Sequence, residues 1–224
     1  MKILAFDTTA DIESVAILID GEVVAVRVLP ERSAAAEILT SEIAAIMAQN
    51  NLQPSDFDAI AVTRGPASFT SVRIGLSCAK GLALVLNKPI LTFDSLLTRA
   101  FGYGEEGSQI LVLLDAKMDE FFAAKFIINN SKAIVETQSR LFTRQELQNY
   151  DFGDIDLLLT DVVSETLQSF SLCAEVVDVS EQYLAQNLAL LANNKISENE
   201  NLENYNSQII PNYSRQPKIG VRKK

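Results

Sequence analysis

The chain has 224 residues, which suits one large domain or two small ones, and its 48% of hydrophobic residues can build a buried core. Its formal net charge of −10 makes a nucleic-acid backbone an unfavourable direct partner. The sequence has no histidine, which excludes every mechanism that depends on imidazole, from Ser-His-Asp triads to histidine-based metal sites. Two distant cysteines, Cys78 and Cys173, form neither a disulfide framework nor a metal-binding pair, a usage typical of a reducing cytosol.

The apolar stretches of the sequence are short. The run before Asp7 has four apolar residues, too few for a secretory signal, and later runs such as 81–86 fall well below the roughly 20 residues of a membrane span. We therefore expect a soluble cytoplasmic protein without membrane contact.

In the first half of the chain, β-rich runs precede alternating helices and strands. Residues 3–6, 14–19 and 23–28 are typical of strands, and Asp20-Gly21 between the last two is a strong hairpin signal. A helix is predicted over 33–50, a fourth strand over 58–63, a second helix over 70–86 and a fifth strand over 90–93. The glycine-rich segment 102–107 then indicates a domain boundary, with domains at 1–102 and 103–224.

The second half resembles the first. Segment 3–11 can be laid on 111–119, because in both an apolar strand is followed by Asp-x-x-x-Asp and by a second apolar run that ends in a turn. This match favours an internal duplication into two related lobes. Further strands are predicted over 157–160 and 174–179, and Ser180 is the expected N-cap of a helix that carries Leu184, Leu188 and Leu191. Segment 195–207 is expected to be a polar loop, and 215–224, with five cations and no acid, a solvated terminus.

Three places offer polar groups for chemistry. Asp7 and Thr8 at the end of the first strand could hold Mg²⁺ and a phosphate, but phosphate-binding loops normally carry glycine, so a capped turn is the simpler interpretation. Arg64, Ser68 and Thr70 precede or open the second helix, and they fit an anion site at its N-terminus as well as ordinary helix capping. Asp115 could belong to a paired carboxylate site with the second aspartate of its motif, or bond within its own turn.

The two long helices are more apolar than one contact face requires. Gly75, Ala79 and Ala83 form a stripe of small residues that could face the sheet of the domain or a partner helix. Two such helices in a small domain suggest an intermolecular helix bundle, although the second domain could also cover them. The expected partner interface comprises Ile38, Leu39, Ile43, Met47, Val72, Gly75, Leu76, Ala79, Leu82, Ala83 and Leu86.

Several of these segments together resemble a known family. Segment 65–76, Gly-Pro-Ala-Ser-Phe-Thr-Ser-Val-Arg-Ile-Gly-Leu, followed by Ala-Lys-Gly-Leu at 79–82, is similar to the G-P-G-S-F-T-G-[LV]-R-I-G and A-K-G-L motifs of the bacterial TsaB (YeaZ) family of M22 glycoprotease-like proteins. The segments 3–8, 115–120 and 211–215 resemble three further motifs of this family in the same order. The chain differs at Ala67 and Ser71, where the family has glycine, and at 35–37, where Ala-Ala-Glu replaces a histidine-containing triplet.

The resemblance implies an α/β protein of actin-like (ASKHA) fold, with two related lobes that each have a mixed sheet flanked by helices. It implies a non-catalytic dimerisation subunit, without metal or cofactor of its own, in the complex that forms N6-threonylcarbamoyladenosine in tRNA. The partners would be TsaD, in a heterodimer, and TsaE. The chain alone would form a homodimer, and tRNA would be contacted only through the complex.

An alternative hypothesis belongs to another class of protein. The chain could be a small ASKHA-type ATP-dependent phosphotransferase that uses Asp7 and Asp115 with Mg-ATP between the lobes. A peptidase is disfavoured on mechanism, because the sequence offers neither histidine nor a credible activated nucleophile.

Overall fold

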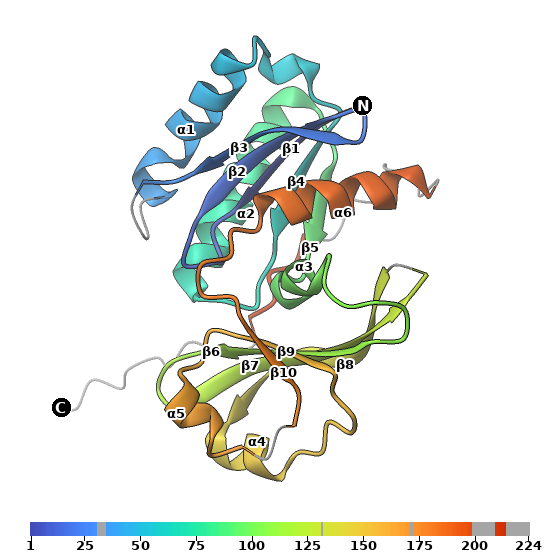
Figure 1. Ribbon diagram of the computed structural model, residues 1–224. Helices are drawn as coiled ribbons and strands as arrows, with labels where there is room; N and C mark the ends of the chain where they lie inside the picture. The colour runs from blue at the N-terminus through green and yellow to red at the C-terminus, as the bar shows by residue number, and fades with distance from the viewer. Residues whose placement is uncertain (31–34, 131, 171–172, 199–208, 214–224) are drawn as a thin grey trace, which may run out of the picture.

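The computed structural model describes residues 1–30, 35–130, 132–170, 173–198 and 209–213. Two five-stranded sheets divide the described chain into an N-lobe and a C-lobe, one above the other in Figure 1. The N-lobe strands are β1 (Lys2–Asp7), β2 (Ser14–Ile19), β3 (Glu22–Val28), β4 (Ala59–Thr63) and β5 (Ile90–Phe93). The C-lobe strands are β6 (Gln109–Asp115), β7 (Glu120–Asn129), β8 (Lys132–Thr143), β9 (Leu157–Thr160) and β10 (Glu175–Asp178).

The two sheets have the same topology. Their strand orders are β3-β2-β1-β4-β5 and β8-β7-β6-β9-β10, so each strand of one lobe has a counterpart five strands later in the other. In both, an antiparallel meander of three strands is extended by two parallel strands beside the first strand of the meander. The repeat of 3–11 at 111–119 therefore corresponds to β1 and β6, which both end at an aspartate.

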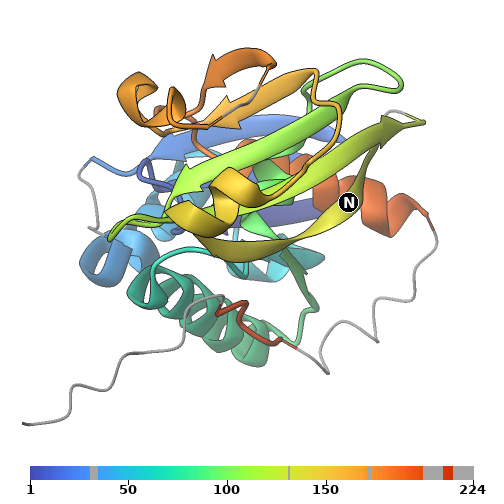
Figure 2. The same ribbon diagram turned by 90° about the horizontal axis from the view of Figure 1, so that it is seen from below.

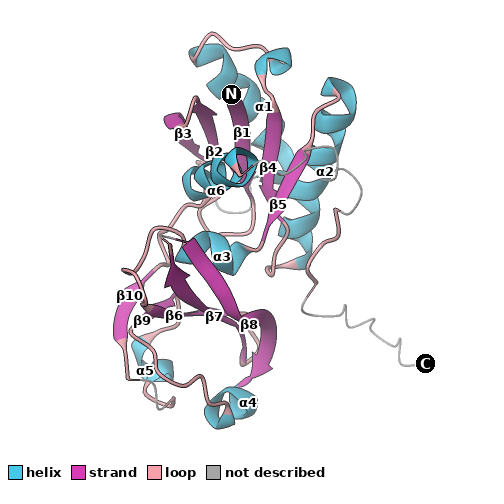
Figure 3. Ribbon diagram, turned by 90° about the vertical axis from the view of Figure 1, so that its right-hand side faces the viewer, coloured by secondary structure: helices cyan, strands magenta, loops and turns pink. Residues whose placement is uncertain are grey.

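Helices cover both faces of the N-lobe sheet. One face carries α1 (Ala35–Gln49) and α2 (Phe69–Leu86), and the other carries α6 (Ala185–Ser197), as Figure 3 shows. The remaining helices are α3 (Ser95–Ala100) between the lobes, α4 (Arg144–Asn149) and α5 (Ser164–Leu167) in the C-lobe, and the short 3₁₀ helix η1 (Pro54–Asp56). Each sheet thus separates two apolar layers, as the alternation of side chains along a strand requires.

The path of α6 differs from the expected domain division. This helix lies in the expected second domain, 103–224, yet it packs on β1, β2 and β4 of the N-lobe through Leu188 and three alanines. Its first amide, at Ala185, donates to the Ser14 hydroxyl of β2. Its N-cap position is Leu184, which makes no side-chain cap, so the predicted cap at Ser180 is wrong. The small side chains of α6 let the helix approach the sheet closely, and this contact outweighs the missing cap.

A second segment returns to the N-lobe near the end of the described chain. Residues 209–213, red in Figure 2, run beside α2. The amide of Asn212 donates to the Arg64 carbonyl, and the Tyr213 ring lies 4.8 Å from the Phe69 ring between centroids. The first three residues of the predicted polar loop, 195–197, belong to α6. Residues 199–208 of that loop and the basic segment 215–224 lie outside the described residues.

The predicted hairpin at Asp20-Gly21 is confirmed. Both residues have positive φ, 49° and 90°, as a two-residue turn between twisted antiparallel strands requires. The predicted strand 90–93 matches β5, and α2 begins one residue before its predicted start. The N-terminal end of the helix predicted over 33–50 lies outside the described residues.

By length and mean hydropathy, 1.4, α2 alone among the described helices could cross a membrane. Core helices of soluble proteins pass the same test. In this structure 22% of the tested window of α2 is buried, including Val72, Leu76 and Ala79 against the sheet.

Candidate functional site: the helix pair and the interlobe cleft

The inner faces of α1 and α2 build the core of the N-lobe. Their apolar side chains pack together with those of β1, β2 and β4 in one cluster. Eight of the eleven residues expected at a partner interface belong to this buried layer: Leu39, Ile43, Met47, Val72, Gly75, Leu76, Ala79 and Ala83. They therefore stabilise the lobe itself, and a partner on the helix pair would meet other residues.

The small-residue stripe of α2 faces its own sheet for a steric reason. A Cβ at Gly75 would lie 2.6 Å from Thr8 Oγ1 and 3.3 Å from Val62 Cγ2. The Thr8 side chain is 1% exposed, and its hydroxyl donates to the Ser71 carbonyl at 2.7 Å. Glycine at 75 thus allows α2 to approach the end of β1, and this closeness leaves no space for a partner helix.

Within the described residues, the outer faces of the two helices are exposed. Leu84 and Val85 of α2 are 84% and 83% exposed, the largest exposures among the large hydrophobic residues that the structure describes. The other three residues of the expected interface, Ile38, Leu82 and Leu86, are half-buried. The exposed positions around them carry mostly small side chains: Ala36, Thr40, Ser41, Ala44 and Ala48 on α1, and Ser77 and Gly81 on α2. We call this surface the outer helix face.

The second candidate region is a cavity of about 530 Å³ between the lobes, which we call the interlobe cleft. The N-lobe contributes the turn after β1, the β4–α2 loop and α3, and the C-lobe contributes the turn after β6 and Asp161 after β9. Residues that follow the carboxyl ends of β1, β6 and β9 line this cavity from both lobes. Such an edge is where two-layer α/β proteins commonly bind ligands.

Asp7, behind this cleft, is fully buried and bonded within its own lobe. Its carboxylate accepts hydrogen bonds from the Thr9 amide and hydroxyl, from the Ala10 amide and from the Thr63 hydroxyl. Four donors of the chain therefore surround the carboxylate, which is the capped turn that the sequence allowed. Asp7 and Thr8 stabilise the junction of β1, β4 and α2, and neither lines the cleft.

The three candidate residues at the start of α2, Arg64, Ser68 and Thr70, lie in different places. Ser68 is the N-cap of α2, accepts from the Ser71 amide at 3.1 Å and lines the cleft. Thr70 is exposed and lies outside the cleft wall, and Arg64 points to a different cavity. The positive φ of the loop, 93°, falls on Gly65, so Ala67 replaces a glycine without a left-handed backbone. The capping interpretation thus accounts for Ser68, and the three residues do not form one anion site.

Asp115 bonds locally as well. Its carboxylate accepts from the Lys117 amide at 2.7 Å and pairs with the Lys117 ammonium at 2.8 Å. Burial raises the pKa of Asp115, but the bonds and charge of Lys117 outweigh this effect and hold the pKa below its usual value. Asp119 instead pairs with Arg144, so the two aspartates of the motif do not form a carboxylate pair.

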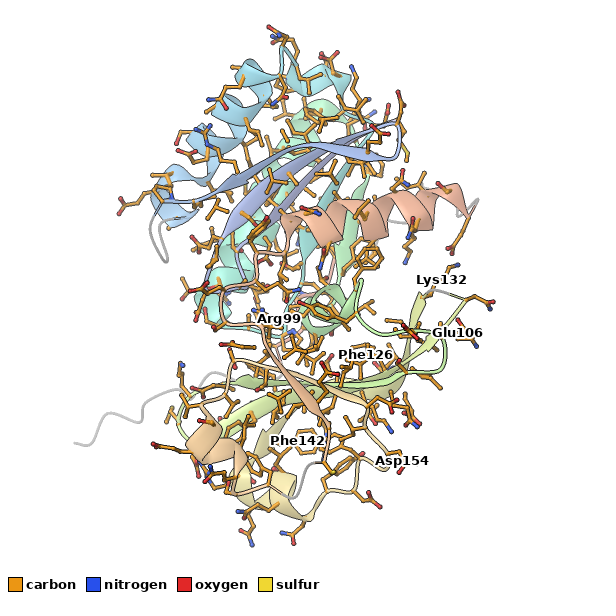
Figure 4. All side chains as sticks on the ribbon, in the orientation of Figure 1. Arg99, Glu106, Phe126, Lys132, Phe142 and Asp154 are labelled. Carbon is orange, nitrogen blue, oxygen red and sulfur yellow. The ribbon has the colours of Figure 1, made fainter. Side chains whose placement is uncertain are left out.

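Two charged residues of the cleft carried no signal in the sequence. Arg99 of α3 is 6% exposed and lies between the lobes in Figure 4, where its Nη1 donates to the Val179 carbonyl at 3.3 Å. Burial lowers its pKa, and the charges of Asp7, Asp161 and others oppose this change. Burial raises the pKa of Asp161, whose carboxylate accepts from the Asp115 amide at 2.7 Å. Neither residue belongs to a local motif, so only the fold could bring them together.

The charges of the cleft wall limit its ligands. Four carboxylates, Asp11, Glu13, Asp115 and Asp161, line it together with two cations, Arg99 and Lys117. A polyphosphate without a cation would meet this excess of negative charge, whereas the Mg-ATP of the phosphotransferase alternative brings its own positive charge. Within the described residues, no group of three or more Asp, Glu, Cys or His side chains is arranged to hold a metal ion.

Fold and site together define a two-lobed α/β protein of actin-like architecture with an uncovered helix pair on one lobe. Two solved structures share this fold: a Pseudomonas aeruginosa protein with similarity to the peptidase YeaZ (TM-score 0.79, 22% identity, 96% of this chain and 99% of that chain) and YeaZ from Pseudomonas aeruginosa (TM-score 0.75, 21% identity, 95% and 99%).

Sequence relatives identify the family. The model of the family described as TsaD, tRNA N6-adenosine threonylcarbamoyltransferase, matches residues 24–222. The tRNA threonylcarbamoyladenosine biosynthesis protein TsaB of Escherichia coli is 37% identical over 128 residues, which are 56% of this chain and 55% of that protein. The chain spans about half the length of the curated relatives it matches. The chain belongs to the family described as TsaD, and its relatives at 33–37% identity are TsaB proteins.

Proposed function

We propose that this chain is a non-catalytic scaffold subunit that binds a TsaD protein through the outer helix face and thereby supports N6-threonylcarbamoyladenosine formation in tRNA. The observation that carries the proposal is the exposure of the consecutive residues Leu84 and Val85 on α2, together with the small exposed side chains of α1. Small side chains allow a second pair of helices to approach closely, and the two large ones would fill the gaps of that pair.

Two further facts support a scaffold over an enzyme. The chain has no histidine, and the interlobe cleft carries an excess of carboxylates. The names of its relatives supply the biological process, since they include both TsaB proteins and tRNA N6-adenosine threonylcarbamoyltransferases.

The proposal extends to the other expected partners. In the absence of TsaD, the outer helix faces of two copies would pair in a homodimer, because the same apolar surface is exposed in the described part of the chain. TsaE would join the assembled pair, and tRNA would be reached through the complex, because a net charge of −10 disfavours direct binding. The setting would be the cytoplasm, where tRNA is modified.

The test is co-expression with the cognate TsaD, followed by mass measurement of the purified species in light scattering. Leu84→Asp combined with Val85→Asp places two charges where the interface would bury two apolar side chains. Full burial of each contributes about 1.5–3 kcal/mol, so the complex should weaken at least about 100-fold. Both residues are exposed, so the variant should keep the unfolding midpoint of the parent chain.

The matched control is Val163→Asp, which adds a charge at a 67% exposed valine on the C-lobe. It should leave the complex intact. A TsaD complex that survives the double variant would remove the outer helix face as the interface. A chain that stays monomeric at high micromolar concentration would remove the homodimer alone.

A further inference from the structure

A second cavity between the lobes, of about 350 Å³, lies apart from the interlobe cleft. It is lined by β5, α3 and α6 of the N-lobe side and by β7 and β8 of the C-lobe, and it shares no lining residue with the cleft. We call it the β5–β8 cavity. Its volume falls at the lower end of the range for small-molecule pockets, and its position between two lobes is a common place for them.

One part of this cavity is aromatic. Phe93 of β5, Phe101 after α3 and Phe126 of β7 line it from both lobes. Figure 4 labels Phe126 and Lys132 on the C-lobe side of the gap. On β8, Ile134 is 46% exposed, so apolar surface continues to the rim. Such a wall favours a ligand with a flat or branched apolar body.

The polar part has one buried donor without a partner. The backbone of Arg64 is held on both sides, because its amide donates to the Phe93 carbonyl and its carbonyl accepts from the Asn212 amide, both at 2.8 Å. Its guanidinium Nε is buried and has no hydrogen-bond partner among the described residues. Because Nε itself is buried, a ligand in the cavity would meet the guanidinium as a positive charge, one that also acts on the neighbouring Asp94.

The carboxylates of the cavity are already engaged by donors of the chain. Asp94 accepts from the amides of Leu96 and Leu97 and from the Ser139 hydroxyl at 2.8 Å. Glu198 accepts from the Lys132 ammonium. A third cation, the Lys195 ammonium, lies 5.8 Å from the centre of the Phe93 ring. Three cations thus face two bonded carboxylates, and this balance favours an anionic ligand group.

We propose that the β5–β8 cavity binds a small carboxylate with an aromatic or branched aliphatic body. The carboxylate accepts from Arg64, and the body packs on Phe93, Phe101 and Phe126. Because Arg64 and Phe93 belong to the N-lobe and Phe126 to the C-lobe, the ligand bridges the lobes and stabilises their present arrangement. The inference is independent of the outer helix face and of any activity of a complex.

The test uses 2-naphthoate as the probe and 2-naphthamide as its neutral counterpart, with the full chain and titration calorimetry. We expect saturable binding of the acid with a dissociation constant below about 1 mM and binding of the amide at least about tenfold weaker, as the loss of a charge-assisted hydrogen bond predicts. The Arg64→Met variant should bind 2-naphthoate more weakly than the parent chain by a similar factor. Ala133→Phe, which fills the cavity from β8, should abolish binding.

The control is Lys80→Met, which removes an exposed cation on α2 outside the cavity and should leave the affinity unchanged. Unfolding midpoints of all variants establish that they are folded. Absence of saturable binding to the parent chain at 5 mM probe, a concentration about fivefold above the expected constant, overturns the proposal. Equal affinities for acid and amide, or an unchanged affinity in Arg64→Met, overturn the assignment of the carboxylate to this cavity.

Discussion

The two glycines of α2 should respond to alanine in opposite directions. Gly75 faces Thr8, whose Oγ1 would lie 2.6 Å from the new Cβ, whereas a Cβ at Gly81 would meet no atom within 4 Å. Alanine gains about 1 kcal/mol of helix propensity at either position. At Gly81 this gain is the whole effect, so Gly81→Ala should raise the free energy of unfolding by about 1 kcal/mol.

At Gly75 the clash outweighs that gain. Thr8 is short, buried and bonded to the Ser71 carbonyl, so it cannot move aside without losing this bond. Overpacking costs about 1–3 kcal/mol and the lost hydrogen bond about 1 kcal/mol more. With the propensity gain subtracted, Gly75→Ala should lower the free energy of unfolding by about 1–3 kcal/mol.

Thermal unfolding of both variants, followed by circular dichroism at 222 nm, measures the difference. For a chain of this size, each kcal/mol shifts the midpoint by about 2–4 °C, so Gly75→Ala should melt below the parent and Gly81→Ala above it. Adding Thr8→Ala to Gly75→Ala removes the clash, and the double variant should lose less stability than the two single losses combined. A Gly75→Ala variant as stable as Gly81→Ala would refute the close approach of α2 to β1.

Three more predictions concern titration, reactivity and the returning segment. Asp161→Asn keeps the hydrogen-bond acceptor, and because burial raises the carboxyl pKa above 3.8, the ionised form costs stability at neutral pH. The variant should therefore have a higher unfolding midpoint than the parent at pH 7. At about pH 3 the Asp161 carboxyl and the asparagine amide are both neutral, so the two midpoints should no longer differ in this way. Equal midpoints at pH 7 would contradict the prediction. Burial raises the pKa of Cys78 to about 11 while Cys173 is exposed, so iodoacetamide at pH 8 should label only Cys173 in the folded chain, as mass spectrometry of peptides would reveal. Tyr213→Ala removes the ring contact with Phe69 and should lower the free energy of unfolding by about 1 kcal/mol in urea titrations. Tyr213→Phe keeps the ring and loses only the exposed hydrogen bond from Arg73 Nε, so it should lower the free energy of unfolding by less.

Local patterns in the sequence were sufficient for most elements of the N-lobe. The hairpin at Asp20-Gly21 requires positive φ at both residues, and this preference is a property of the two residues themselves. The strands β2 and β5 follow from apolar runs bounded by turn residues. By contrast, β8 has mostly exposed side chains and no strong apolar period, so its pairing with β7 was invisible without the fold.

The sequence by itself therefore determined the N-lobe strands, the repeat of two similar halves, the excess of apolar residues on two helices and the absence of histidine chemistry. Only the tertiary structure decided which side of α2 is buried, because a helix that is apolar nearly all round has no periodic face to reveal it. It also decided that α6 returns to the N-lobe and that Arg99 and Asp161 meet between the lobes. These outcomes depend on contacts between residues far apart in the chain, and such contacts leave no local pattern to read.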